Sequence, residues 1–254
     1  MTPFELISFD EAGFKMIGDE GNRRYWESAG GDGISLFYFG IPPDIPVPLS
    51  EIDALRGWYR NNIAASGKAM IENEVVTIDG VASIRQIIKI PQQPSGITYL
   101  GSFTIPFRDR SFVLKVQCEE RGMTGMREAV VMDSLFGDGT VTIDDGKLVG
   151  WQADPYDPGV QLPLMRNRAE DPAFDAQFPD HPLSRVRKAF AQIEGSLRLH
   201  DLLKAQPSFA GPIVREAEAV VPGGNLGAQA PGWKMTPEPP AEAAPPKKPW
   251  WKRG

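Results

Sequence analysis

The sequence predicts an α+β fold in which an antiparallel β-sheet packs against about three helices, followed by a disordered C-terminal tail. Residues 75–136 hold three strand-like runs and then one helical run. Within them, residues 111–119 alternate, with Phe112, Leu114 and Val116 on one face, as a half-buried strand does. Hydrophobic residues make up 41% and charged residues 24% of the 254 residues, which is typical of globular proteins.

Three short strands are expected to open the chain as a meander: residues 14–17, 25–27 and 34–39. Residues 41–48 contain four prolines, each of which fixes φ, so they form a rigid extended connector. A first helix is predicted over residues 51–65, with Ser50 as its N-cap and Gly67 after its last turn.

Four consecutive antiparallel strands are predicted next: residues 68–79, 82–90, 97–107 and 110–119. Asp79-Gly80 is a typical hairpin turn between the first two. The periodicity then becomes helical over residues 126–136, and Thr124 is predicted as the N-cap of this helix. Another strand, turn and strand are expected within residues 140–151.

Residues 154–182 are rich in proline and acidic residues and are predicted to form a surface insertion held down by Phe174 and Phe178. A last helix is predicted over residues 183–203, with Pro182 in its first turn. Three helices against one sheet give an α+β sandwich.

The composition changes at Pro207. Ten of the 24 prolines lie from there to the end, where large apolar residues become rare. Such a segment buries too little surface to offset the entropy of ordering. We therefore expect one domain over residues 1–206 and a flexible tail over residues 207–254 that ends in a Trp-Trp-basic motif.

Charge and cysteine content exclude several function classes. The net charge is −6, and the tail carries +2, which leaves −8 on residues 1–206. An acidic body argues against nucleic-acid binding. Cys118 is the only cysteine, so an internal disulfide and a zinc site built on thiolate pairs are both excluded, and a cytoplasmic location is expected. The first ten residues lack the basic and apolar regions of a secretory signal.

The sequence predicts no catalytic, cofactor or metal site. Cys118 is in phase with the apolar face of its strand, so core packing is favoured over a nucleophile with His181 or His200 as base. Asp180 is expected to cap the last helix while His181 packs locally, and His200 is expected to interact with the dipole at a helix C-terminus.

The order of opening strands, helix, long antiparallel strands and closing helix resembles the PsbP-like group, which includes the bacterial DcrB-like proteins. The resemblance covers roughly residues 10–200. The segments that carry it are residues 80–85, 99–106, 112–117 and 119–127. It implies a non-enzymatic binding module, since the group includes a photosystem subunit, a small-GTPase binder and chaperones or adaptors. The insertion and the tail depart from the pattern, and the leader or lipobox of exported members is lacking.

Two groups of residues are predicted to bind a partner. The first is the end of the tail, where two tryptophans lie among four cations: Lys247, Lys248, Trp250, Trp251, Lys252 and Arg253. The second is Arg108 and Arg110 at a hairpin tip, which the fold was expected to bring near Arg121, Arg127 and Glu128 as one charged cluster.

The leading hypothesis is an adaptor or chaperone-like module that binds a protein partner through its sheet and docks its tail on a second surface. The alternative is a peripheral membrane protein whose tail contacts anionic lipid. A hydrolase using Cys118 or His181 is less favoured.

Overall fold

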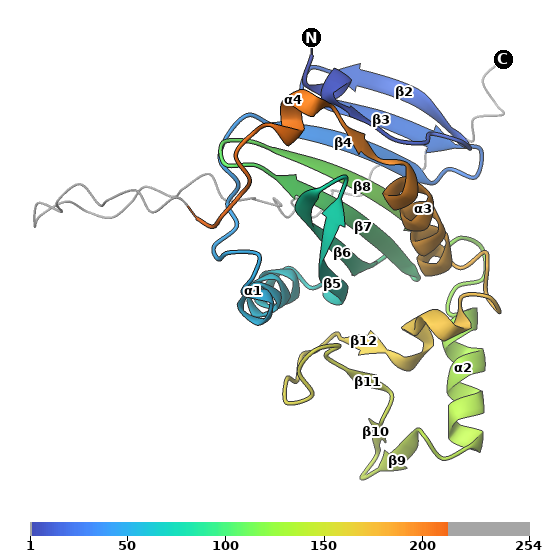
Figure 1. Ribbon diagram of the computed structural model, residues 1–254. Coiled ribbons are helices and arrows are strands. Elements are labelled where there is room, and N and C mark those ends of the chain that lie inside the picture. Colours follow the sequence, from blue (N-terminus) through green and yellow to red (C-terminus); the bar gives the residue numbers. More distant parts are fainter. Residues whose placement is uncertain (1, 213–254) are drawn as a thin grey trace, which may run out of the picture. The chain divides into compact units, whose positions relative to one another are not determined.

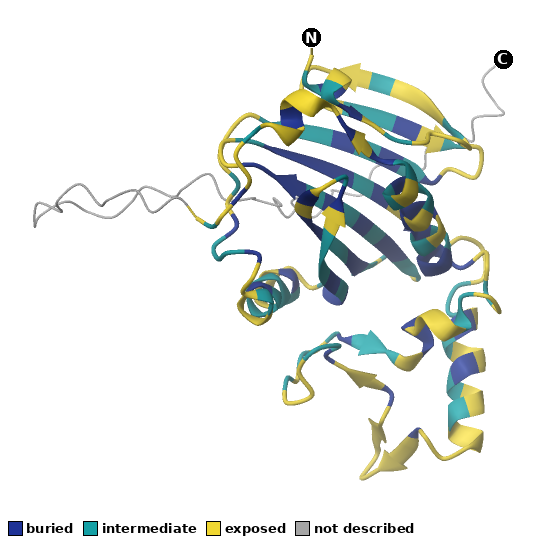
Figure 2. Ribbon diagram, in the orientation of Figure 1, coloured by how far each residue is buried: buried dark blue, intermediate teal, exposed yellow. Residues whose placement is uncertain are grey.

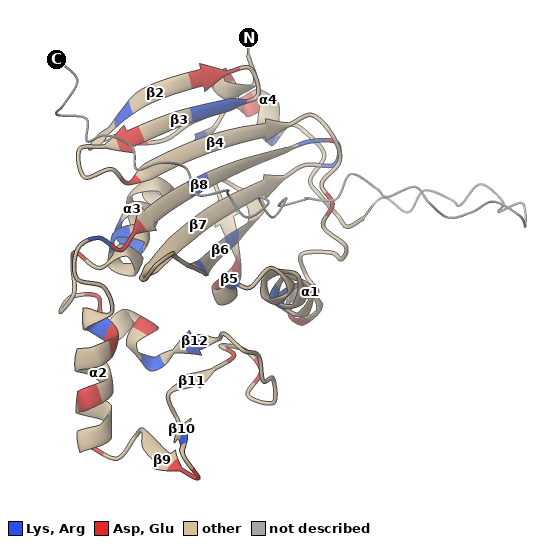
Figure 3. Ribbon diagram, turned by 180° about the vertical axis from the view of Figure 1, so that it is seen from behind, with Lys and Arg blue, Asp and Glu red and all other residues tan. Residues whose placement is uncertain are grey.

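The computed structural model describes residues 2–212, and its centre is a seven-stranded antiparallel sheet with the strand order β2-β3-β4-β8-β7-β6-β5 (Figure 1). The α+β class and the antiparallel sheet predicted from the sequence are confirmed. The strands of this sheet are β2 (Phe14–Glu20), β3 (Arg23–Ser28), β4 (Gly33–Phe39), β5 (Ala69–Ile78), β6 (Val81–Pro91), β7 (Ile97–Pro106) and β8 (Ser111–Glu119). The β2–β3 hairpin carries opposite charges side by side, since Asp19 pairs with Arg24 and Glu20 with Arg23 (Figure 3).

One face of the sheet packs against α3 (Pro182–Ser196). The alternation in β8 places Phe112, Leu114 and Cys118 in this core, together with Phe103 of β7. Gly101 lies where α3 crosses β7, and a Cβ there would be 2.3 Å from the Phe190 ring. The missing side chain therefore lets the helix approach the sheet closely.

The opposite face is covered at one end by α1 (Ile52–Ala65), which packs against β5. Ile84 and Ile88 of β6 point toward this side, because they pair with Thr104 and Leu100 rather than with the core residues of β7. Leu55 of α1 contacts the cluster around Ile84, and Ile63 contacts the cluster around Ile88.

The predicted second helix, α2 (Met126–Gly137), does not lie on the sheet. It packs against the chain that follows it, which contains β9 (Thr142–Asp144), β10 (Lys147–Val149), β11 (Gln152–Ala153), β12 (Arg166–Asn167) and the short 3-10 helices η2 (Arg168–Glu170) and η3 (Pro172–Phe174). We call residues 126–178 the α2 segment. Its separate core joins Val131, Trp151 and Ala169 with the two predicted anchors, Phe174 and Phe178. The expectation that this helix covers the sheet was wrong.

A buried polar network connects the α2 segment to the sheet. Lys89 Nζ of β6 lies 2.9 Å and 3.0 Å from the two carboxylate oxygens of Glu170, and the Tyr99 hydroxyl donates to the same carboxylate at 2.7 Å. The Arg127 guanidinium donates to the carbonyl of Ala169 and pairs with Asp175 at 2.9 Å. Figure 2 shows buried positions on both sides of this junction.

The ends of the described chain pack against each other. The 3-10 helix η1 (Pro3–Leu6) leads into β1 (Ile7–Ser8), which pairs with β13 (Arg198–Leu199). The short helix α4 (Asp201–Lys204) follows. Contacts continue past the expected domain end at residue 206, because Ser208 forms a bridge with Phe107 and Phe209 is buried with Ile84.

Three helix boundaries differ from expectation. Glu51, not Ser50, precedes α1, and Gly125 in a left-handed conformation, not Thr124, precedes α2. The predicted last helix ends at Ser196, where the chain becomes extended to form β13. His200 is consequently the N-cap of α4 and accepts from the Leu202 amide, so its expected place near a helix C-terminus was wrong. No helix among residues 2–212 is both long and apolar enough to cross a membrane.

Candidate functional site

A cavity of about 460 Å³ lies where the end of β8, the start of α2 and the start of α3 meet. Its lining combines carboxylates, one histidine, arginines and apolar side chains: Glu120, Arg121, Met123, Met126, Arg127, Gln177, Phe178, Pro179, Asp180, His181, Pro182 and Arg185. A second hollow, beside Arg60 and Asp154, has a volume of only about 10 Å³. The larger cavity is therefore the better candidate for a functional site.

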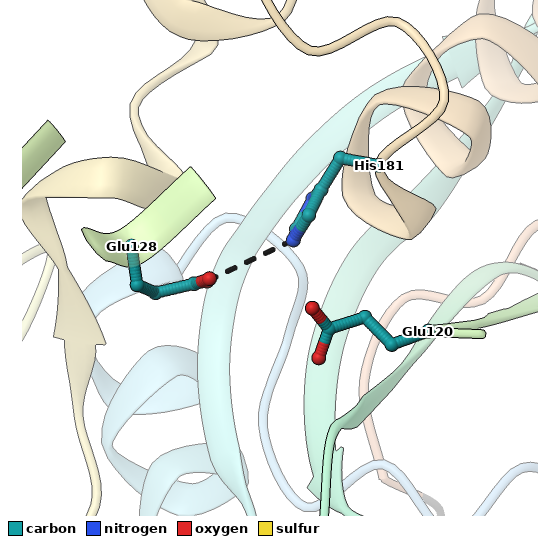
Figure 4. Close-up of side chains that lie close together, drawn as sticks. All are labelled: Glu120, Glu128 and His181. Atoms are coloured by element: carbon teal, nitrogen blue, oxygen red, sulfur yellow. Dashed lines mark ion pairs between the residues drawn. The ribbon is translucent and has the colours of Figure 1, made fainter. Parts of the chain in front are cut away.

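Three side chains from three elements point toward one another at this cavity (Figure 4). Glu120 follows β8, Glu128 lies in the first turn of α2, and His181 precedes α3. One potential ligand atom from each lies within 4.8 Å of those of the other two. The His181 Nε2 atom is 3.7 Å from Glu128 Oε1, which is too long for a direct hydrogen bond.

His181 is fixed by its role at the helix start. Its Nδ1 atom accepts a hydrogen bond from the Leu183 amide at 3.3 Å, so His181 itself, and not Asp180 as expected, caps α3. Its ring also contacts the Tyr99 ring edge-on. The side chain is only 6% exposed, and its Nε2 atom has no hydrogen-bond partner among the described residues.

Burial and three nearby guanidinium groups, those of Arg127, Arg185 and Arg187, lower the pKa of His181 to about 3. His181 is therefore neutral at physiological pH. Burial also raises the pKa of Glu128, and the negative charges of Glu120 and Glu170 add to that effect.

The two glutamates are held differently. The carboxylate of Glu120 accepts the amide of Ile97 and the amide of Gly125, each at 2.8 Å, which fixes its orientation. Glu128 Oε2 is buried and has no hydrogen-bond partner among residues 2–212. The cavity thus holds two carboxylates close together, one of them incompletely satisfied.

The arginines of the cavity have partners outside it. Arg127 pairs with Asp175, and Arg185 pairs with Asp32 at 2.9 Å. Arg121 donates to the Gly31 carbonyl at 2.7 Å and lies 3.9 Å from Asp32. These cations therefore do not neutralise the two glutamates by direct contact.

Of the residues singled out from the sequence, Arg121, Arg127, Asp180 and His181 line this cavity and Glu128 lies beside it, whereas the predicted partner-binding residues Arg108 and Arg110 do not line it. Cys118 is buried in the sheet core as predicted, and burial raises the pKa of its thiol to about 12, which disfavours the thiolate that a nucleophile needs. Trp250, Trp251 and the other predicted tail residues lie outside the described residues.

The predicted charged cluster around the hairpin tip was wrong. Arg108 and Arg110 precede β8, whereas Arg121 and Arg127 follow it, and a nine-residue strand spans about 30 Å. Arg110 instead pairs with its neighbour Asp109 at 2.8 Å. Figure 3 shows that the hairpin between β7 and β8 and the start of α2 lie at opposite ends of the sheet.

Glu120, Met123 and Met126 were not predicted as functional residues, and Glu128 was named only as a member of the predicted charged cluster. Within residues 119–127, Thr124 was predicted as a helix cap and Arg121 and Arg127 as members of the charged cluster, and no short spacing connects this segment with His181. The available signal was weak: a glycine-rich turn, residues 122–125, that carries exposed methionine between two glutamates.

No family model matches this chain, and no curated protein matches it. Among solved structures, the chain is similar to the solution structure of cyanobacterial PsbP (CyanoP) from Synechocystis sp. PCC 6803, with 11% sequence identity and a TM-score of 0.34. The match covers 54% of this chain and 85% of that chain. The matched protein is a PsbP, the group that the sequence resembles, but a likeness at this level carries no inference about function.

Proposed function

We propose that the protein is a non-enzymatic protein-binding module, adaptor or chaperone-like, which binds its partner at the cavity between β8, α2 and α3. The observation that carries this proposal is a group of exposed apolar side chains at the cavity and on the helix beside it. Met123 is 77% exposed, Met126 is 49% exposed, and Val130, one helical turn further along α2, is 48% exposed. Met123 and Met126 also line the cavity.

This arrangement is typical of a binding surface. Exposed apolar side chains that are close together and border a cavity mark interaction sites more often than scattered single ones do. Methionine is unbranched and polarisable, so it adapts to different partner shapes and is common on surfaces that bind several peptides. The β9–β10 hairpin adds the exposed cross-strand pair Ile143 and Leu148 to the apolar surface of the α2 segment.

Nucleophilic catalysis at Cys118 has less support, because its thiol is buried and its pKa is raised. Turnover of an ester, phosphate or peptide substrate by the purified protein, lost in Cys118→Ala or His181→Ala, would contradict the proposed function. A cytoplasmic location remains part of the proposal, since the only cysteine is free and buried.

Membrane contact through the tail is the alternative proposal, and its residues lie outside those that the structure describes. A version of the protein ending at residue 212 keeps Phe209 and the Ser208 bridge. Comparing it with the full-length chain therefore separates partner binding at the cavity from membrane contact through the tail. Sedimentation of only the full-length chain with anionic vesicles at low salt would favour the alternative.

The proposed function is tested by quantitative pull-down from the native lysate. We expect Met123→Ser combined with Met126→Ser to reduce recovery of the specific partner at least tenfold. The matched control is Met16→Ser on β2, where Met16 is 42% exposed but lies on a different element. Equal recovery by the double variant and the control would contradict binding at the cavity, and loss only upon truncation at residue 212 would place recognition in the tail.

A further inference from the structure

We propose that the cavity receives a basic side chain, lysine or arginine, from the bound partner, and that its ammonium or guanidinium group bridges Glu120 and Glu128. This inference rests on the proposed function and names the chemistry by which the same surface recognises its partner.

Among residues 2–212, the arginines of the cavity lie near acidic side chains, whereas Glu120 and Glu128 form no ion pair with a lysine or an arginine. Arg121, Arg127 and Arg185 contact Asp32, Asp175 or backbone carbonyls, as described above. Glu128 lies 3.7 Å from a histidine that is neutral, and Glu120 accepts hydrogen bonds from two backbone amides. Two neighbouring carboxylates repel each other, and a cation between them relieves that repulsion.

The hydrogen bonds of His181 distinguish an organic cation from a metal ion. Because Nδ1 accepts the Leu183 amide, the proton of the neutral ring is on Nε2. A metal needs a free lone pair on the nitrogen that it binds, so a metal at Nε2 would require the helix cap to be given up. A basic side chain makes no such demand, because its N–H groups bind carboxylate oxygens.

Two buried polar atoms at the cavity have no hydrogen-bond partner among the described residues, and a peptide carries the complementary groups. His181 Nε2–H is a donor aimed toward the cavity from a side chain that is only 6% exposed, and Glu128 Oε2 is an acceptor. A basic residue within a peptide offers N–H donors in its side chain and a carbonyl acceptor in its backbone. A basic residue therefore carries both kinds of group that these two atoms lack.

The remaining walls of the cavity suit the aliphatic part of such a residue. Met123, Met126, Phe178 and Pro179 line it together with the carboxylates. Lysine and arginine bury their methylene stems against apolar surface while their charged ends reach polar groups. A cavity of about 460 Å³ is large enough for one such side chain.

The test is an NMR titration of the full-length, nitrogen-15-labelled protein with Nα-acetyl-arginine methylamide and Nα-acetyl-lysine methylamide. The amides of Ile97 and Gly125 report on the site, because both donate to the Glu120 carboxylate. We expect saturable shifts of these two signals with at least one basic probe. Nα-acetyl-citrulline methylamide, which has nearly the shape of the arginine probe without its charge, is expected to bind at least about tenfold more weakly.

Glu128→Gln is expected to weaken binding of the basic probe about tenfold, because it removes one of the two charges with little change in shape. Asp133→Asn is the matched control, since it removes the same charge from an exposed position of the same helix. If Glu128→Gln fails to fold, the comparison of arginine with citrulline in the unmodified protein still decides.

Three results would overturn the inference. They are equal binding of citrulline and arginine, no saturable shift with either basic probe, and a titration with zinc chloride that saturates the site while the Leu183 amide loses its hydrogen bond. Failure here leaves the proposed function standing if Met123→Ser with Met126→Ser still abolishes partner recovery. If that double variant has no effect while arginine binds, the cavity binds cations but is not the partner site.

Discussion

The buried pair of Lys89 and Glu170 provides the sharpest test of how the α2 segment is held on the sheet. Both side chains are almost inaccessible, with exposed fractions of 4% and 0%, and the two charges are 2.9 Å apart. Glu170 also accepts the Tyr99 hydroxyl at 2.7 Å and the Asn167 amide at 2.6 Å. Removing one charge therefore leaves the other buried without a counter-ion.

Breaking such a pair from one side typically costs about 3–5 kcal/mol, because the remaining charge stays buried. We expect Lys89→Met and Glu170→Gln each to lower the free energy of unfolding by that amount. The double variant buries no charge, so its loss is expected to be about 1–2 kcal/mol, far below the sum of the single losses. The four proteins are compared by urea unfolding followed through tryptophan fluorescence.

The matched control is Glu20→Gln in the exposed pair Glu20–Arg23, whose charges are only 2.6 Å apart. Its urea midpoint is expected to be unchanged, because water screens an exposed pair whatever its length. The reasoning fails if the single losses at Lys89 and Glu170 are small, or if they simply add in the double variant.

Three further predictions follow from the packing and the site. Gly101→Ala is expected to lower the free energy of unfolding in urea by about 1–3 kcal/mol, because its Cβ would be 2.3 Å from the Phe190 ring. Adding Phe190→Leu is expected to recover part of that loss. An unchanged stability of Gly101→Ala would contradict the close approach of α3 to β7. His181 has a folded-state pKa of about 3, below that of the unfolded chain, so its protonation lowers the stability as pH decreases from about 6.5, by up to about 1.4 kcal/mol per pH unit. The raised pKa of Glu128 acts in the opposite direction. His181→Asn is expected to flatten the dependence of the free energy of unfolding on pH. Arg127→Met is expected to accelerate hydrogen exchange in α2 more than in β7. The reason is that the Arg127 side chain connects α2 to four other residues: Ala169, Asp171, Asp175 and Ser184. Equal acceleration in α2 and β7 would show that the α2 segment does not open separately.

The central sheet was predictable because its strands carry their information locally. Alternation in residues 111–119 identified the core face of β8, and Asp79-Gly80 identified the β5–β6 hairpin, where Asp79 has a positive φ. The position of α2 was not predictable in this way. Its packing partners Trp151, Ala169 and Phe174 lie in a segment without periodicity, so nothing local shows that it packs there rather than on the sheet.

The site was harder to predict for the same reason. Glu120, Glu128 and His181 come from three elements and meet only through tertiary packing. His181 and His200 both cap helices, a role for which serine, threonine, aspartate and asparagine are the usual candidates. A prediction based on the usual capping residues therefore made Asp180 the cap of α3 and placed His200 near a helix C-terminus.

The pairing of β1 with β13 has a consequence for biosynthesis. Ile7 is synthesised well before its partner Leu199, which is made only after the whole sheet and α3. At roughly 5–20 residues per second, the N-terminal segment waits on the order of ten seconds or more for that partner. Its apolar side chains Phe4 and Ile7 are exposed during this time, so the nascent chain is a natural client for a holding chaperone until synthesis of the body is complete.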